Sequence, residues 1–108
     1  LPRYHPKLIR SFVNFGMMHM ELGEYPNALS TSQNSIGLSA ENSSFDHLDI
    51  AYSYMNIGHV YEAMNDYPKA IAAYEKLLEI EKQHLPPNHP NLAESYNIIG
   101  SIYNRMGE

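Results

Sequence analysis

Residues 50–74 read IAYSYMNIGHVYEAMNDYPKAIAAY, and the pattern in this stretch returns at a fixed distance on either side. Gly58 lies 42 residues after Gly16 and 42 residues before Gly100, and the neighbouring residues recur in the same register. Self-similarity at this period is typical of stacked supersecondary units, which present an extended binding surface rather than an enclosed active site. The chain is therefore predicted to be a repeat array.

Apolar residues three or four apart indicate two helices in each unit. The expected helices cover residues 6–22, 26–38, 47–64, 68–84 and 89–106, so the sequence predicts an all-α fold of five helices. A glycine in the first helix of each pair is expected to face an alanine of the second, so that the backbones approach closely. The predicted packing face of the first helices consists of Leu8, Phe12, Phe15, His19 and Leu22 in the first unit, Ile50, Tyr54, Ile57, Tyr61 and Met64 in the second, and Leu92, Tyr96, Ile99, Tyr103 and Met106 in the third.

The second unit resembles the tetratricopeptide repeat in its spacing of aromatic, aliphatic and small residues. The matching positions are Tyr54, Ile57, Gly58, Tyr61, Ala70 and Tyr74. The resemblance implies an α-solenoid, a superhelix of stacked antiparallel helix pairs, with about 2.5 repeats here. The 42-residue period is longer than the family's usual 34. Together with LPPNHP at residues 85–90, it resembles the subtype found in kinesin light chains.

The period divides residues 1–108, a single repeat domain, into units 1–42, 43–84 and a truncated unit 85–108. We expect a fragment of a longer array, with a homodimer or an exchange of helices through the truncated end. In the first unit Ser32 and Ser35 stand where Tyr74 and Leu77 stand in the second, and Gly37 lies within the helix. Since serine and glycine are weak helix formers, this helix is expected to be the least stable.

Composition and charge exclude several classes of function. The formal net charge is −5, and residues 11–68 contain no Lys or Arg, so the basic stripe of a nucleic-acid-binding protein is missing. The chain has no cysteine, which excludes disulfides and thiolate chemistry and fits a reducing compartment, so we expect a cytoplasmic protein. No apolar run is long enough for a membrane helix, and no membrane partner is expected.

The histidines do not predict a metal site. His5, His47 and His89 occupy one slot, just before the first helix of each unit, and they lie two helices apart. We expect a helix-start role instead, with Asp46 or Asn88 as N-cap. No serine lies in a strained Gly-x-Ser-x-Gly turn. The sequence therefore predicts no metal, no cofactor and no catalytic residue, and the chain is not expected to be an enzyme.

A second stripe on the first helices faces away from the packing stripe, and the resemblance implies that it lines a concave, peptide-binding groove. Its members are Arg10, Val13, Asn14, Met17 and Met20, then Tyr52, Met55, Asn56, His59 and Glu62, then Glu94, Asn97, Ile98, Ser101 and Asn104. Asn14 and Asn56 share one slot, where the resemblance implies an amide that holds a peptide backbone. The methionines supply an adaptable apolar floor.

Two functions are compatible with these observations. The first is a scaffold or adaptor that binds a short linear peptide of a partner or cargo protein in the groove. Because the groove lacks a cluster of Lys and Arg, a neutral, apolar or basic peptide suits it better than an acidic one. The alternative is a structural or self-associating solenoid segment with no peptide ligand.

Overall fold

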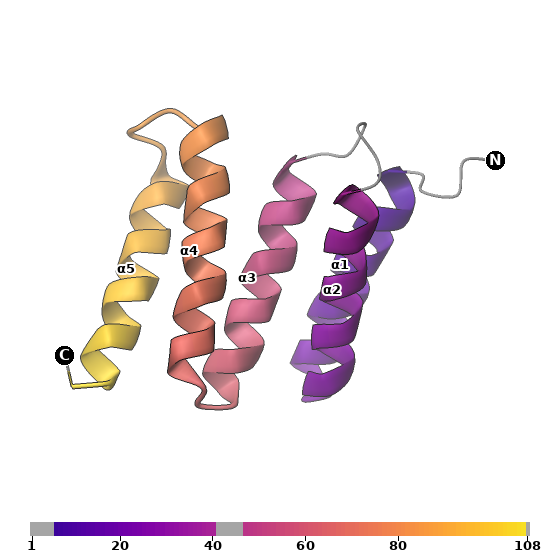
Figure 1. Cartoon of the computed structure of the whole chain (residues 1–108), viewed down its shortest axis with the longest axis horizontal. Helices are drawn as coiled ribbons and strands as arrows, with labels where there is room; N and C mark the ends of the chain where they lie inside the picture. Colours follow the sequence, from indigo (N-terminus) through magenta and orange to yellow (C-terminus); the bar gives the residue numbers. More distant parts are fainter. Residues whose placement is uncertain (1–5, 41–46, 108) are drawn as a thin grey trace.

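The computed structural model describes residues 6–40 and 47–107, and these residues form five α-helices with no strand. In chain order the helices are α1 (Pro6–Glu21), α2 (Tyr25–Ala40), α3 (His47–Ala63), α4 (Tyr67–His84) and α5 (Pro90–Arg105). Successive helices run antiparallel and form a row, with α1 and α2 at one end and α5 at the other (Figure 1). The predicted all-α solenoid is confirmed, and the helix bounds differ from the expected ones by at most two residues.

Three turns of one kind end the first helix of each unit. Gly23, Asn65 and Gly107 lie 42 residues apart and all have a positive φ, of 77°, 62° and 81°. In the first two turns the next residue's N–H returns to the helix, from Glu24 to the His19 carbonyl and from Asp66 to the Tyr61 carbonyl, both at 2.8 Å. This left-handed ending satisfies the last carbonyl groups of a helix. The period is thus a property of the backbone as well as of the side chains.

The helix starts differ from the expectation at one position. His89, and not Asn88, is the N-cap of α5, because its Nδ1 accepts a hydrogen bond from the Asn91 N–H at 3.1 Å. An imidazole nitrogen that accepts a hydrogen bond can replace a cap oxygen here. Asp46, the other expected cap, and His5 lie outside the described residues.

The hydrophobic core lies mainly among α3, α4 and α5. Its centre is Tyr74 of α4, which is fully buried, with Ile102 of α5 and Ala51 of α3 in the same cluster. Between α2 and α3 the buried residues include serines instead, and Ser35 and Ser53 form a hydrogen bond across that interface at 2.5 Å. The buried side of α2 is therefore less apolar than the buried side of α4, which contains Tyr74 and Leu77. Less burial of apolar surface agrees with the predicted weakness of α2.

The predicted packing face is wrong at five of its residues. Residues of that face that are exposed instead of packed are Phe15, Leu22, Met64, Tyr96 and Tyr103. In α1 the buried stripe is Ile9, Val13 and Gly16, which is rotated relative to the predicted one because α1 packs against both α2 and α3. A helix with two neighbours buries a wider stripe than the spacing of its largest apolar residues indicates.

Candidate interaction surface

The predicted groove residues lie on α1, α3 and α5, the first helix of each unit, and most of them reach solvent. We call their solvent-facing surface the groove face. The exposed members are Arg10, Asn14, Met17, Tyr52, Glu94, Asn97, Ser101 and Asn104, and the half-buried ones are Met20, Met55, His59, Glu62 and Ile98. Two cavities on this face are lined by residues from more than one of these helices, so the structure brings part of the predicted set together.

Val13 and Asn56 do not belong to the groove face, which corrects the prediction. Each of the two residues is only 3% exposed, because α1 packs directly on α3 at this point. The Asn56 Nδ2 donates a hydrogen bond to the Val13 carbonyl oxygen at 3.2 Å. Asn56 therefore holds a backbone, as expected of this slot, but the backbone is that of α1 in the same chain.

The first cavity opens between α3 and α5, and α4 forms its floor. Its volume is about 210 Å³, and we call it the α3–α5 cavity. Its lining residues are Leu48, Ala51, Tyr52, Met55, Leu77, Glu81, Asn91, Glu94, Ser95 and Ile98. Of these, Tyr52, Met55, Glu94 and Ile98 belong to the predicted groove stripe. The cavity thus has apolar walls, with carboxylates at its floor and rim.

A buried carboxylate of the α3–α5 cavity was missed by the sequence analysis. Glu81 is only 7% exposed, and its Oε1 accepts a hydrogen bond from the Ser95 hydroxyl at 2.5 Å. The available signal was its position, since Glu81 continues the apolar stripe of α4 one turn beyond Leu77. A glutamate at such a position is either paired in the core or placed for a ligand.

The second cavity lies toward the C-terminal ends of α3 and α5. It has a volume of about 360 Å³ and is lined by Met20, His59, Glu62, Ala63 and Arg105. Arg105 donates to the Glu62 carboxylate at 2.6 Å, which joins α5 to α3. The two helices are therefore tied near their C-terminal ends and separated by the α3–α5 cavity nearer their N-terminal ends.

Tyr74 connects this second cavity to the core. Its hydroxyl donates to Glu62 Oε1 at 3.0 Å and lies 2.7 Å from His59 Nδ1. Burial raises the pKa of the Tyr74 hydroxyl well above its usual value, and Glu62 raises it further, so the group stays a neutral donor. Burial also lowers the pKa of His59, against the opposing charges of Glu62 and Glu94. His59 is thus held by the core and reaches the groove face only in part.

The described residues give no arrangement for metal or nucleophilic chemistry. His47 and His84 stack with ring centroids 3.8 Å apart and line a further hollow of about 240 Å³ on the other side of Glu81. Within residues 6–40 and 47–107, no three His, Cys, Asp or Glu side chains are placed to hold a metal ion. None of the helices in this part of the chain is both long and apolar enough to cross a membrane.

Stacked antiparallel helix pairs with a fixed period and a shared groove face define a helical-repeat solenoid. Within that class the chain belongs to the tetratricopeptide repeat family, whose model matches residues 7–83 and again residues 49–108. A search of curated proteins found no match. Tetratricopeptide repeats generally mediate protein–protein interactions and are typically not enzymes, so the fold implies a protein partner.

Proposed function

We propose that this protein is a scaffold or adaptor that binds a short linear segment of a partner or cargo protein on its groove face. The observation that carries the proposal is the pair of cavities on that face, one between α3 and α5 and one at Met20, His59 and Arg105. The α3–α5 cavity has apolar walls and a few polar groups, which is the usual form of a binding pocket, whereas three of the five residues that line the second cavity, His59, Glu62 and Arg105, are polar or charged. An extended segment lying across α1, α3 and α5 can place side chains in both.

The exposed residues between and around the cavities suit such a segment. Tyr52 and Met17 are 45% and 41% exposed, and both offer apolar contact area. Asn14, Asn97 and Asn104 are exposed amides that can both donate to and accept from an extended backbone. The segment that fits this face is neutral, apolar or basic, because the side chains that line the α3–α5 cavity include two glutamates and no Lys or Arg.

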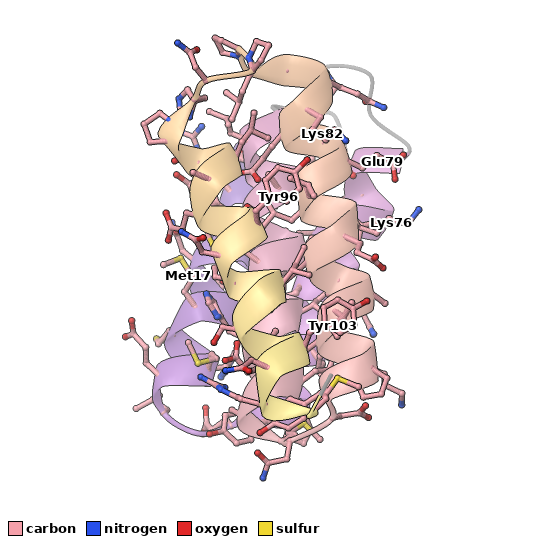
Figure 2. The ribbon with its side chains drawn as sticks, turned by 90° about the vertical axis from the view of Figure 1, so that its left-hand side faces the viewer. Met17, Lys76, Glu79, Lys82, Tyr96 and Tyr103 are labelled. Carbon is pink, nitrogen blue, oxygen red and sulfur yellow. The ribbon has the colours of Figure 1, made fainter. Side chains whose placement is uncertain are left out.

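Two exposed tyrosines provide the test. Tyr52 lies on the groove face and lines the α3–α5 cavity, whereas Tyr96, 53% exposed, lies between α5 and α4 at the α5 end of the helix row (Figure 2). A peptide array probed with the labelled protein supplies ligands, which are then titrated against Tyr52→Ala and Tyr96→Ala. Loss of a tyrosine anchor costs about 1–2 kcal/mol, so Tyr52→Ala should weaken binding about 5- to 30-fold. Binding that is indifferent to Tyr52→Ala would contradict the groove assignment.

A second candidate function is self-association as a structural solenoid segment, and one observation favours it. Tyr96 and Tyr103, 53% and 36% exposed, lie two turns apart on the side of α5 next to α4, at the α5 end of the helix row (Figure 2). Exposed aromatic side chains are enriched at protein interfaces. Under this alternative Tyr96→Ala lowers the mass measured by concentration-dependent light scattering and Tyr52→Ala does not. The same two variants therefore separate the two functions.

We also propose the kinesin-light-chain-like subtype and a cytoplasmic location. The subtype is supported by the left-handed turn residues Gly23, Asn65 and Gly107, which keep the 42-residue period. The location is supported by the absence of cysteine from the sequence. Localisation of the tagged full-length protein by microscopy tests the second of these.

A further inference from the structure

The starting observation is a buried carboxylate that forms no ion pair with the Lys and Arg side chains of the described residues. Glu81 lines the α3–α5 cavity and is 7% exposed, and among the described residues its side-chain partner is the Ser95 hydroxyl. Removing a carboxylate from water is costly unless a charge partner or several hydrogen bonds replace the water. One serine hydroxyl replaces only part of that hydration. The open side of the carboxylate faces a cavity with apolar walls.

The first interface between units shows how the same chain treats a buried acid elsewhere. Asp49 of α3 is 6% exposed, and the Arg10 Nε of α1 donates to its Oδ1 at 3.3 Å. Here α1 and α3 pack directly on each other. The interface therefore contains both a buried acid and the arginine that pairs with it.

The second interface has no arginine at the corresponding position. On the 42-residue period Arg10 corresponds to Tyr52 and Asp49 corresponds to Asn91, and both of these residues line the α3–α5 cavity. The acid is now Glu81, supplied by α4, and no Lys or Arg is among the cavity's lining residues. The second interface thus keeps a buried negative charge and a space, and lacks the positive group that fills the first.

We propose that the α3–α5 cavity is a specificity pocket for one Lys or Arg side chain of the bound segment, with Glu81 as its buried counter-ion. This inference rests on the proposed function and specifies the partner's chemistry. The long methylene stem of such a side chain packs against Met55, Leu77 and Ile98, while its charged end reaches Glu81. Glu94 at the rim adds a second negative charge along the entry. An apolar side chain of the same length would fill the space and leave Glu81 with the Ser95 hydroxyl but without a positive charge beside it.

The size of the cavity supports a single side chain as its occupant. Its volume of about 210 Å³ is below the roughly 300–1,000 Å³ of pockets that take drug-sized ligands. The charge at its floor selects among side chains of similar length. The expected order of affinity is therefore arginine and lysine first, norleucine next and glutamate last.

The experiment uses capped amino acids as probes. The Nα-acetyl methylamides of lysine, arginine, norleucine and glutamate are titrated into the isotope-labelled 108-residue chain, and the amide signals of Ser95 and Ile98 are followed by NMR. The lysine and arginine probes should bind about tenfold or more tightly than norleucine, which has a similar length and no charge. Equal affinities for lysine and norleucine would overturn the proposal.

Two glutamates of α4 give matched variants. Glu81→Gln keeps an acceptor for the Ser95 hydroxyl and removes the charge, and it should weaken lysine binding about tenfold. Glu79→Gln makes the same change in net charge at an exposed position, on the side of α4 away from α5 (Figure 2), and should leave binding unchanged. A Glu81→Gln protein that binds lysine as the parent does would refute the role of Glu81.

A third variant guards against a folding defect at the buried position. Tyr52→Arg changes an exposed residue and restores the arginine that the first interface has at this slot. The new guanidinium should compete with the lysine probe and weaken its binding about tenfold. An unchanged affinity in this variant also counts against the proposal.

The outcomes separate this inference from the proposed function. If array peptides bind in a Tyr52-dependent way and Glu81→Gln leaves their affinity unchanged, the pocket assignment fails while the groove function stands. If the lysine probe binds in a Glu81-dependent way and no array peptide binds, the adaptor function fails while the charge preference of the cavity stands.

Discussion

The ring of Tyr74 occupies the space that Gly58 leaves open on α3. A Cβ atom built at residue 58 would lie 2.7 Å from two atoms of that ring, closer than real Cβ contacts come. The glycine was expected to face an alanine of the second helix, and in this unit it faces the tyrosine instead. In the first unit a Cβ atom built at the matching glycine, Gly16, would lie 2.8 Å from the Ser32 hydroxyl oxygen and 3.8 Å from the Ala28 carbonyl oxygen. A glycine that accommodates a ring is needed for side-chain packing as well as for backbone approach.

Gly58→Ala should therefore destabilise the fold although alanine is the better helix former. Overpacking a core costs about 1–3 kcal/mol, and the gain in helix propensity returns about 0.5–1 kcal/mol. We expect a net loss of up to about 2.5 kcal/mol in the free energy of unfolding, measured with urea. Gly100→Ala is the matched control, because its Cβ would meet no atom within 4 Å, and it should stabilise the protein by about 0.5–1 kcal/mol. A stabilised Gly58→Ala protein would show that the Tyr74 ring moves aside freely.

Ser32→Ala should stabilise the first unit. Ser32 is fully buried, and its hydroxyl oxygen has no hydrogen-bond partner among the residues that the structure describes. A buried polar group without a hydrogen bond costs about 1–3 kcal/mol in desolvation. We expect its removal in Ser32→Ala to raise the free energy of unfolding by about 1 kcal/mol. The neighbouring Ser35→Ala removes the hydrogen bond to Ser53 and should cost about 0.5–1.5 kcal/mol. Thermal melts of the two variants should shift in opposite directions.

Asn14→Ala and Asn56→Ala should differ although the two residues share a slot in the repeat. Asn56 is buried and donates to the Val13 carbonyl, so its loss should destabilise the protein by about 1–2 kcal/mol. Asn14 is exposed, and its loss should change stability by less than about 0.5 kcal/mol. Urea unfolding of both variants measures the two changes in the free energy of unfolding. Equal stabilities would mean that the contact between α1 and α3 is not maintained in solution.

His59 should make stability depend on pH. Because burial lowers its pKa in the folded state, the unfolded chain binds a proton more readily. The contribution of His59 to the free energy of unfolding is fully present above the unfolded-state pKa of about 6.5. This contribution is lost as the pH falls through the lower folded-state pKa. His59→Gln should therefore lose less stability between pH 7.5 and pH 5 than the parent, as measured by urea unfolding at each pH. Parallel pH profiles of the two proteins would rule out this role.

The fold was predictable because its signal is local and repeated. Each unit carries its own turn, at Gly23, Asn65 and Gly107, and its own apolar spacing, so every part of the pattern supports the same reading. The groove residues were predictable only where a helix faces solvent, as at Tyr52 and Asn97. Which residues two neighbouring units bury depends on how closely their first helices approach. The spacing of residues along one helix does not predict the distance between two helices of neighbouring units. The burial of Asn56 between α1 and α3 was therefore not predicted.

The α3–α5 cavity was missed for the same reason. It exists because α3 and α5 stay apart where α1 and α3 pack together, and that difference arises between units. The sequence did carry one usable sign, the glutamate at position 81 in line with the apolar residues of α4. A charged residue in an apolar stripe is therefore worth following in other arrays of this period.

The ion pair between Arg105 and Glu62 connects the two helices on either side of the α3–α5 cavity. It joins α5 to α3 near their C-terminal ends, while the α3–α5 cavity separates them nearer their N-terminal ends, so the pair of helices forms a wedge-shaped opening with a fixed corner. Both helices pack on α4, and a side chain of the bound segment that enters the opening would press between two successive units. In a stacked array each unit passes its rotation on to the next. A single bound side chain can thus alter the curvature of the superhelix, and the displacement grows with every repeat stacked beyond it.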